Sequence, residues 1–471
     1  MTKHLSLPIL IGLMVVSVDS VRNLPSLALF GHYLPAFFLV AVLFFLLPVS
    51  FISAELSAVF SKDECNGIYH WVANAYNDHA GMFAIWSQWG SNAIWFPANL
   101  LFMSSTFLTI ISPNLASSHL ITTIIMIAIF LFVTLLNLKG VKESAVVAFL
   151  CMIMGVVIPV ILLLASFIFW LIKGYPLQFF LSLSHLVFPL NSSNIAALTA
   201  IIISFLGMEL SSVHVSRVIN PKKTYTLAIW VATILVVAIM FLGAISIALI
   251  LPKDSINIYN GLSATFSTIF SKFNLTILTP AIIIMIVLGS LGSAISWSIS
   301  PAKGMAEAAQ KGFLPKVLAK ENNAGSPYNM LILQAIIISC LSLSLMFFNN
   351  ISNFYWILIS LNTEVYLLMY LLMFASAIKL RKSGNYSKTI IQSDFLFYMI
   401  AIAGIIGTLF AFIVGFIPSS AVIQGMSTAT YLTIYIAGVI IMCLLFLLFV
   451  FYKKHTAPDK YNRNSIALAS S

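Results

Sequence analysis

Residues 12–31, GLMVVSVDSVRNLPSLALFG, and residues 202–221, IISFLGMELSSVHVSRVINP, decide the fold. Each stretch is apolar at its ends but polar in the middle. Pro25 removes a backbone donor from the first, so we do not expect a continuous helix there. Gly207 and Glu209 occupy the middle of the second. Two interrupted membrane spans in corresponding positions indicate an inverted repeat, in which unwound segments meet at mid-membrane and offer backbone groups to a substrate.

Composition agrees with a membrane protein. Of the 471 residues, 61% are hydrophobic and 8% are charged, whereas soluble domains carry about a quarter charged residues. A helix needs about 20 apolar residues to cross a bilayer, and stretches of that size recur from residue 7 almost to residue 452. The chain is therefore predicted to be an all-α polytopic membrane protein without a sizeable soluble domain.

Apolar runs separated by short polar stretches predict twelve transmembrane helices. They cover residues 7–30, 34–60, 82–111, 119–137, 145–172, 194–217, 225–251, 276–298, 329–348, 352–379, 395–417 and 427–452. The lysine-rich stretch after the eighth predicted helix, residues 299–328, is too polar to cross the membrane. It predicts short helices along the membrane surface.

We expect one transmembrane domain over residues 1–452. Residues 1–172 form the first repeat of five helices and residues 194–379 the second, in a leucine-transporter-type arrangement. Residues 395–452 add two helices, and residues 453–471 form a short cytoplasmic tail.

Charge fixes the expected orientation. The net charge of +10 is the excess of 23 lysines and arginines over 13 aspartates and glutamates. Most of the basic residues lie in short loops and in the tail on one side of the predicted bundle. Only Lys173, Lys253 and Lys272 fall on the other side. By the positive-inside rule both termini are cytoplasmic, in the inner membrane, and the positive charge is no sign of nucleic-acid binding.

Ionisable side chains inside a span are candidate functional groups because burying them in lipid is costly. They are Asp19, Arg22, Glu55, Glu209, His214 and Glu364. Asp19 and Arg22 are three residues apart, so on a helical turn they could neutralise each other. In the alternative, Asp19 receives a substrate ammonium group and Arg22 a carboxylate. Glu209 is either a buried hydrogen-bonded hub or a group that binds substrate or a coupling proton.

No motif indicates an enzyme, a metal or a cofactor. There is no phosphate-binding glycine loop and no paired-cysteine or His-Glu metal spacing. The four cysteines are scattered through the chain, which gives no disulfide framework.

Three stretches resemble transporters of the amino acid–polyamine–organocation superfamily. Residues 204–230 (SFLGMELSSVHVSRVINPKKTYTLAIW) are similar to its sixth span, and residues 47–89 to its second span, inner loop and third span. Residues 289–329 are similar to its eighth span and the following loop. The resemblance runs from about residue 7 to residue 452 and is greatest to the glutamate–GABA antiporter branch.

The resemblance implies a substrate site. Gly207 and Glu209 match the phenylalanine-x-glycine-x-glutamate core of the sixth span, and Val18, Asp19 and Ser20 fall where many relatives have a Gly-Ser-Gly loop that binds the substrate carboxylate. Trp297 matches an aromatic residue near substrate, where it would make a cation–π contact or only pack.

Two departures bear on the substrate. The Gly-Ser-Gly loop is absent, and Ser293 stands where the antiporter branch has a glutamate. The resemblance therefore implies a secondary transporter that exchanges amino acids, or an amino acid for an amine, by alternating access, but it does not identify the substrate. A proton-coupled symporter is the alternative, and a non-transporting amino-acid sensor is a third. A channel is disfavoured because the single charges form no rings, and the sequence does not indicate an oligomeric state.

Overall fold

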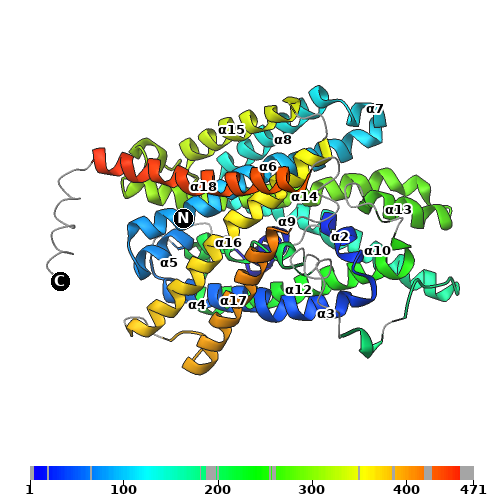
Figure 1. Ribbon diagram of the computed structural model, residues 1–471, viewed down its shortest axis with the longest axis horizontal. Coiled ribbons are helices and arrows are strands. Elements are labelled where there is room, and N and C mark those ends of the chain that lie inside the picture. The colour runs from blue at the N-terminus through cyan, green and yellow to red at the C-terminus, as the bar shows by residue number, and fades with distance from the viewer. Residues whose placement is uncertain are drawn as a thin grey trace.

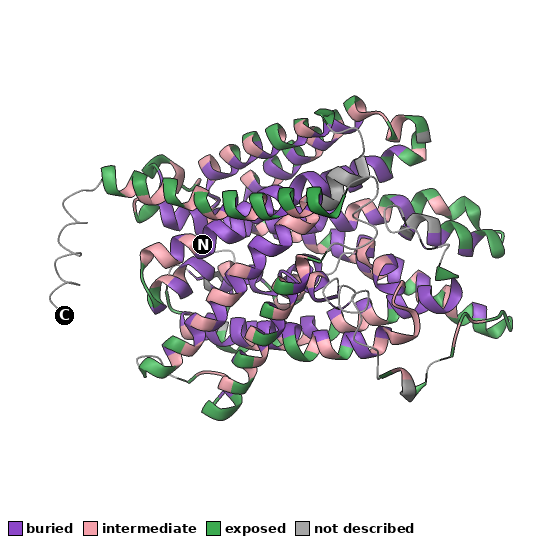
Figure 2. Cartoon of the chain, viewed as in Figure 1, coloured by how far each residue is buried: buried purple, intermediate pink, exposed green. Residues whose placement is uncertain are grey.

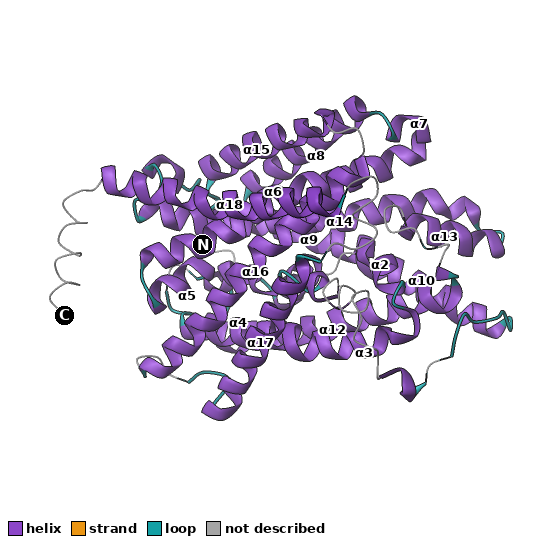
Figure 3. Ribbon diagram, viewed as in Figure 1, coloured by secondary structure: helices purple, strands orange, loops and turns teal. Residues whose placement is uncertain are grey.

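The computed structural model describes residues 5–18, 21–63, 66–180, 182–186, 198, 201–253, 256, 261–347, 351–384, 388–417 and 427–456. Over these residues the secondary structure is helical, apart from one isolated bridge between Leu5 and Val218 (Figure 3). Eleven helical segments are long and apolar enough to cross a membrane. The chain is thus an all-helical polytopic membrane protein.

The first half of the chain contains the helices of its first five predicted spans and three short helices outside those spans, α5, α7 and η5. They are α1 (Leu7–Val18), η1 (Val21–Asn23), α2 (Leu24–Ala28), η2 (Gly31–Tyr33), α3 (Leu34–Ala41), the π-helix η3 (Val42–Leu46), α4 (Leu47–Val59), α5 (Ile68–Ala75), α6 (Asp78–Ile111), α7 (Pro113–Ala116), α8 (His119–Lys139), α9 (Val141–Met152), the π-helix η4 (Ile153–Val157), α10 (Ile158–Ile172) and η5 (Leu183–Leu186). The predicted interruption of the first span falls between the end of α1 and the start of α2.

The second half begins with the other interrupted segment. Its helices are η6 (Met208–Arg217), α12 (Pro221–Ile250), α13 (Gly261–Lys272), η8 (Thr276–Leu278), α14 (Thr279–Gln310), η9 (Lys316–Ala319), α15 (Tyr328–Leu343), η10 (Ser344–Phe347), α16 (Ile351–Ser383), α17 (Asp394–Gly415) and α18 (Thr428–Thr456). The sixth predicted span, 194–217, is described only in part. It contains a short apolar helical stretch, Ile201–Val215, that is not among the eleven candidate spans.

Helix α6 lies at the centre of the packing and contacts both α16 and α14, while α1 packs against α12, α9 and α14. Helix α18 runs along the outside of the bundle and is exposed over most of its length (Figures 1 and 2). Only 6% of its most apolar window is buried, as expected of a helix that faces lipid.

The two ends of the bundle are distinct. Lys453 at the end of α18 lies 3.6 Å from Asp78 at the start of α6, so these segments share one end. In Figure 1 this end, with α5, lies at the left, and α7 and α13 lie at the right. The predicted cytoplasmic segments therefore gather at one end and the predicted external ones at the other.

The polar stretch after the eighth predicted span differs from expectation. Helix α14 continues through Pro301 to Gln310, and only η9 forms a separate short helix before α15. Ala302, Ala306 and Ala309 on the continuation are buried against the bundle, which makes a polar stretch stable as part of a long helix rather than as a surface helix.

Candidate functional site

The interrupted first and sixth spans run antiparallel to each other. Leu5, just before α1, bridges to Val218, just after η6. At the other end, the carbonyl oxygen of Ser17 lies beside Gly207, just before η6. The interruption of the first span therefore lies next to the interruption of the sixth, the arrangement that an inverted repeat requires.

Gly207 lets the two interruptions approach closely. Its φ of 111° is one that residues with a Cβ rarely adopt. A Cβ at this position would lie 2.8 Å from the carbonyl oxygen of Ser17 and 2.8 Å from Cζ2 of Trp297. Glycine is required here both by the backbone conformation and by the space.

Trp297 of α14 joins this junction to the eighth span. Its indole Nε1 donates to the carbonyl oxygen of Ser17 over 2.8 Å. The hydroxyls of Ser17 and Ser296 are hydrogen-bonded at 2.6 Å, and Nδ2 of Asn92 donates to the carbonyl oxygen of Trp297. The end of α1 is thus tied to α14, and α14 to α6.

The Glu209 side chain is buried at the start of η6 and accepts hydrogen bonds from three neutral side chains. The hydroxyls of Tyr366 and Tyr370 donate to Oε1 and Oε2, each over 2.5 Å. Nε2 of Gln88 donates to Oε1 over 3.0 Å. The hydroxyl of Tyr370 also accepts from the backbone N–H of Gly207 over 2.9 Å. A carboxylate whose hydrogen-bond donors, within the described residues, are all neutral is a favourable place for a substrate cation or a proton.

Arg22 is the cation on the other side of the junction. It is partly buried, and Nη1 donates to Oδ1 of Asn99 over 2.8 Å. Its guanidinium lies 5.5 Å from the ring centroid of Trp95. The buried Nε makes no hydrogen bond within the described part of the chain.

Aromatic rings connect Arg22 to Glu209. Trp95 stacks on Trp297 with ring centroids 5.2 Å apart, and Trp297 lies 5.2 Å from Tyr366, which donates to Glu209. The site therefore has a cation at one end, a carboxylate at the other and a wall of indole and phenol rings between them.

The predicted site residues fall into two groups. Trp297, Gly207 and Glu209 meet as described, and Val18 is buried at the last position of α1. Ser293 is buried one helical turn before Trp297. Asp19 and Ser20 lie outside the described residues, so their predicted roles remain predictions.

The three side chains that donate to Glu209 were missed by sequence reasoning: Gln88, Tyr366 and Tyr370. They are neutral and sit in apolar helices, so no charge marks them. The only available signal was the spacing of the two tyrosines, four residues apart on one face of α16.

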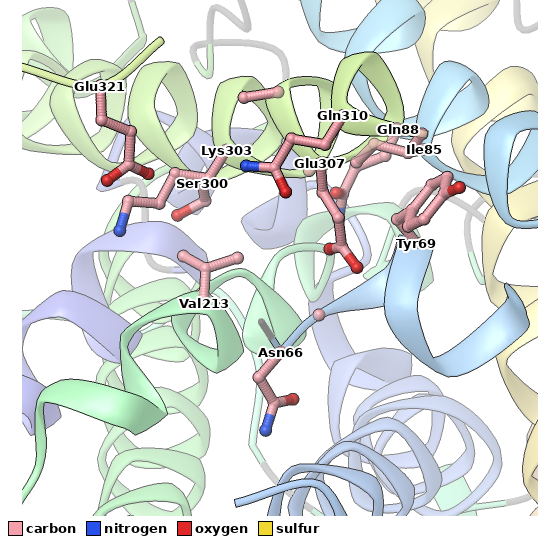
Figure 4. Close-up of a pocket in the computed structure, with 13 residues that line it drawn as sticks. Asn66, Tyr69, Ile85, Gln88, Val213, Ser300, Lys303, Glu307, Gln310 and Glu321 are labelled. Atoms are coloured by element: carbon pink, nitrogen blue, oxygen red, sulfur yellow. The ribbon is translucent and has the colours of Figure 1, made fainter. Parts of the chain in front are cut away.

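A pocket of about 580 Å³, including some open solvent, leads toward the site from the end of the bundle that holds α5. Its lining includes Asn66, Gly67 and Tyr69 near α5, Val213 of η6, and Ser300, Lys303, Glu307 and Gln310 of α14, with Glu321 beyond it (Figure 4). Gln88 also lines it, so the donor to Glu209 is reached from this space. We call this space the Glu307 pocket.

Among the described residues there is no group of three or more side chains suited to hold a metal ion. The polar groups gathered at the junction are instead hydrogen-bond donors and acceptors of the kind that bind a small charged organic molecule.

Comparison with known proteins gives a consistent result. The family model described as amino acid permease matches residues 5–442. The chain is 32% identical to an uncharacterized transporter of Legionella pneumophila, over 95% of this chain and 96% of that protein. It is 29% identical to a glutamate/gamma-aminobutyrate antiporter of Lactococcus lactis, over 98% and 92%. It is 24% identical to a probable agmatine/putrescine antiporter of Lactococcus lactis, over 73% and 72%.

Proposed function

Since the chain belongs to the amino acid permease family of the amino acid–polyamine–organocation superfamily, and is thus an amino acid or amine transporter and not an enzyme, we propose that it is an exchanger. It takes one amino acid across the inner membrane in return for another, or for an amine, by alternating access. Its relatives named as antiporters carry substrates of these two chemical kinds.

The observation that carries this proposal is the junction of Ser17, Gly207 and Trp297. It joins the interruptions of two antiparallel spans, with Arg22 on one side and Glu209 on the other. An amino acid presents a carboxylate and an ammonium group, and the site presents one group of opposite charge for each. We propose that Arg22 binds the carboxylate and Glu209 the ammonium group.

The Glu209 carboxylate suits this role because its present partners are replaceable. Hydroxyl and amide donors can turn to water or to substrate oxygens, whereas an ammonium group adds a charge-assisted bond worth roughly 1.5–3 kcal/mol. The rings of Trp297 and Tyr366 would then face the cation and exclude water from it.

Asp19 adds a second proposal, which rests on sequence alone. A carboxylate at the interruption of the first span attracts an ammonium group and repels a carboxylate unless Arg22 neutralises it. A zwitterionic or cationic amino acid, or its amine, is then preferred over an acidic one, and Asp19→Asn weakens binding of cationic amines about tenfold.

Movement follows from the repeat organisation. We propose that residues 1–172 and 194–379 are the two inverted repeats, that residues 395–452 are accessory helices, and that both termini face the cytoplasm. The Glu307 pocket is then the cytoplasmic entrance, and the hydrogen bonds at Glu209 close its inner end in this conformation.

Counterflow into proteoliposomes tests the exchange. Liposomes loaded with glutamate, GABA, agmatine or arginine should accumulate the labelled substrate from outside, and empty liposomes should not. A thermal-shift screen against amino acids and amines selects the substrate first, because a bound ligand stabilises the folded protein. Stabilisation without flux under any loading would identify a sensor instead.

Proton-coupled symport is the second candidate, favoured by the position of Glu209 one side chain away from the Glu307 pocket. Gln88 connects the two: it lines the pocket and donates to Glu209. In that case a pH gradient drives uptake into empty liposomes, and Glu209→Gln, which keeps the shape but cannot titrate, flattens the pH dependence. If uptake requires internal substrate and does not depend on the pH gradient, proton-coupled symport is excluded.

A further inference from the structure

His70 of α5 is held between two carboxylates at the edge of the Glu307 pocket. Its Nε2 lies 2.8 Å from Oδ2 of Asp63, in the loop before α5. Its Nδ1 lies 3.1 Å from Oε1 of Glu307 on α14. The ring of Phe60 packs edge-on against the imidazole with centroids 5.1 Å apart.

Both ring nitrogens thus face a carboxylate oxygen. A neutral imidazole has one N–H and would turn a lone pair toward one of the two oxygens, whereas an imidazolium donates to both. The geometry therefore fits the protonated ring. Burial lowers the pKa of His70, but hydrogen bonds and charge from Glu307 and Asp63 outweigh it, so the pKa lies above its ordinary value of 6.5.

Of the other charged groups on the helices packed against α5, Lys303 of α14 lines the pocket, and the nearest ones on α6 and α16 have partners of their own. Asp78 of α6 accepts from Tyr69 and pairs with Lys453, and Lys379 of α16 lies over the ring of Tyr76. The charge at His70 is consequently set by its own proton and by its two carboxylate partners.

The proton on His70 alters the charge of the pocket. The charged lining residues are Lys303, Glu307 and Glu321, one cation and two carboxylates. Figure 4 shows the Lys303 side chain extending toward Glu321, while the Glu307 carboxylate points away from both. When His70 is an imidazolium, its charge is shared between Asp63 and Glu307, and the pocket is less negative by one charge than with a neutral ring. When His70 loses its proton, Glu307 is uncompensated and the lining carries an excess negative charge.

We propose that His70 is a specificity-determining residue that acts through Glu307, so that the charge of the substrate admitted from this end of the transporter depends on the pH there. The proposal rests on the proposed function in taking the Glu307 pocket as the substrate entrance. Below the pKa of His70 the less negative lining admits an anionic substrate such as glutamate. As the pH rises through that value, the negative lining repels an anion and attracts a cation such as agmatine.

The potential in the pocket can be measured without transport. Gln310 is exposed and lines the pocket, so Gln310→Cys, in a variant whose four native cysteines are replaced by serine, accepts methanethiosulfonate reagents. The ratio of the reaction rates of an anionic and a cationic reagent reports the local potential, and the ionisation of the thiol cancels in the ratio. We expect this ratio to fall about fivefold between pH 5.5 and 8.5, the size of effect that one charge gives at this range in water.

The variants give distinct results. His70→Gln should hold the ratio at its low, alkaline value at every pH, and Glu307→Gln should hold it near or above the acid value. Asp63→Asn, at a side chain that is 45% exposed, should shift the midpoint to lower pH without disturbing the fold. His455→Gln, at an exposed histidine on the same end of the bundle, should behave as the parent protein.

A ratio that does not change with pH in the parent protein, or that changes equally in His70→Gln, overturns the inference and leaves exchange untouched. Failure of counterflow overturns the proposed function and leaves this ratio untouched, so the two failures are distinguishable.

Discussion

The indole N–H of Trp297 donates to the backbone carbonyl oxygen of Ser17 over 2.8 Å, although the two residues are 280 positions apart in the chain. This bond holds the end of α1 against α14 at the point where the first span is interrupted. The helix terminus leaves carbonyl groups without helical partners, and the indole satisfies one of them. The eighth span thereby helps to define the site.

Trp297→Phe should therefore weaken substrate binding. Phenylalanine keeps an aromatic ring beside Trp95 but leaves the Ser17 carbonyl without its donor, at a cost of about 1–3 kcal/mol for a buried acceptor. We expect the apparent affinity for substrate to fall about tenfold, measured by concentration dependence of counterflow. Trp86→Phe is the matched control, because Trp86 donates in the same way to the carbonyl oxygen of Met442 on the peripheral α18. Equal losses in both variants would assign the Trp297 bond to general stability.

Gly207→Ala should abolish most of the exchange. The alanine would adopt a φ of 111°, which costs roughly 1–2 kcal/mol, and its Cβ would meet Ser17 and Trp297 at 2.8 Å. Gly312→Ala is the control, since Gly312 also has a positive φ, of 85°, but nothing lies within 4 Å of its Cβ position. Exchange rates are compared at equal amounts of protein in the membrane. Full activity of Gly207→Ala would contradict the close approach of the two interruptions.

The two tyrosines that donate to Glu209 should not be equivalent. Tyr370→Phe leaves both Oε2 of Glu209 and the N–H of Gly207 without their partner. Tyr366→Phe leaves Oε1 with the amide of Gln88. We expect Tyr370→Phe to lower the exchange rate several-fold more than Tyr366→Phe, and the reverse order would show that the Gly207 contact is unimportant.

Topology has a direct test in two glycines that both have a positive φ and open space around them, Gly174 and Gly312. In intact cells Gly174→Cys should react with an impermeant thiol reagent and Gly312→Cys should not, because the basic residues around Gly312 predict a cytoplasmic position for it. Labelling of Gly312→Cys from outside would reverse the proposed orientation.

Sequence reasoning identified the main features of the fold for physical reasons. Charge and proline in the middle of an apolar stretch are costly, so the interruptions at residues 12–31 and 202–221 were visible without a structure. The same reasoning ended α14 too early, because it judged residues 299–310 by polarity and could not see the surface that buries Ala302 and Ala306. It also gave no helix for α5 or α13, which pack on the bundle without crossing it.

The site was predicted less completely than the fold. Glu209 was identified as an ionisable residue inside a span and Trp297 through the resemblance. The donors to Glu209 come from helices remote in sequence: Gln88 from α6 and Tyr370 from α16. A hydrogen bond between such helices depends on how they pack, and a neutral donor leaves no periodic or charge signal. The same holds for His70 and Glu307, which are 237 positions apart.

The central claim is that Arg22 and Glu209 hold the two ends of an amino acid at the junction of the first and sixth spans. Binding of glutamate, GABA and putrescine to the parent protein, Arg22→Gln and Glu209→Gln tests it most directly, since putrescine has no carboxylate. Arg22→Gln should weaken the binding of glutamate and GABA about tenfold or more and leave the binding of putrescine unchanged. Glu209→Gln should weaken the binding of all three ligands. Each loss follows because a charge-assisted hydrogen bond is worth roughly 1.5–3 kcal/mol. If Arg22→Gln lowers the affinity for putrescine as much as the affinity for glutamate, the account is contradicted.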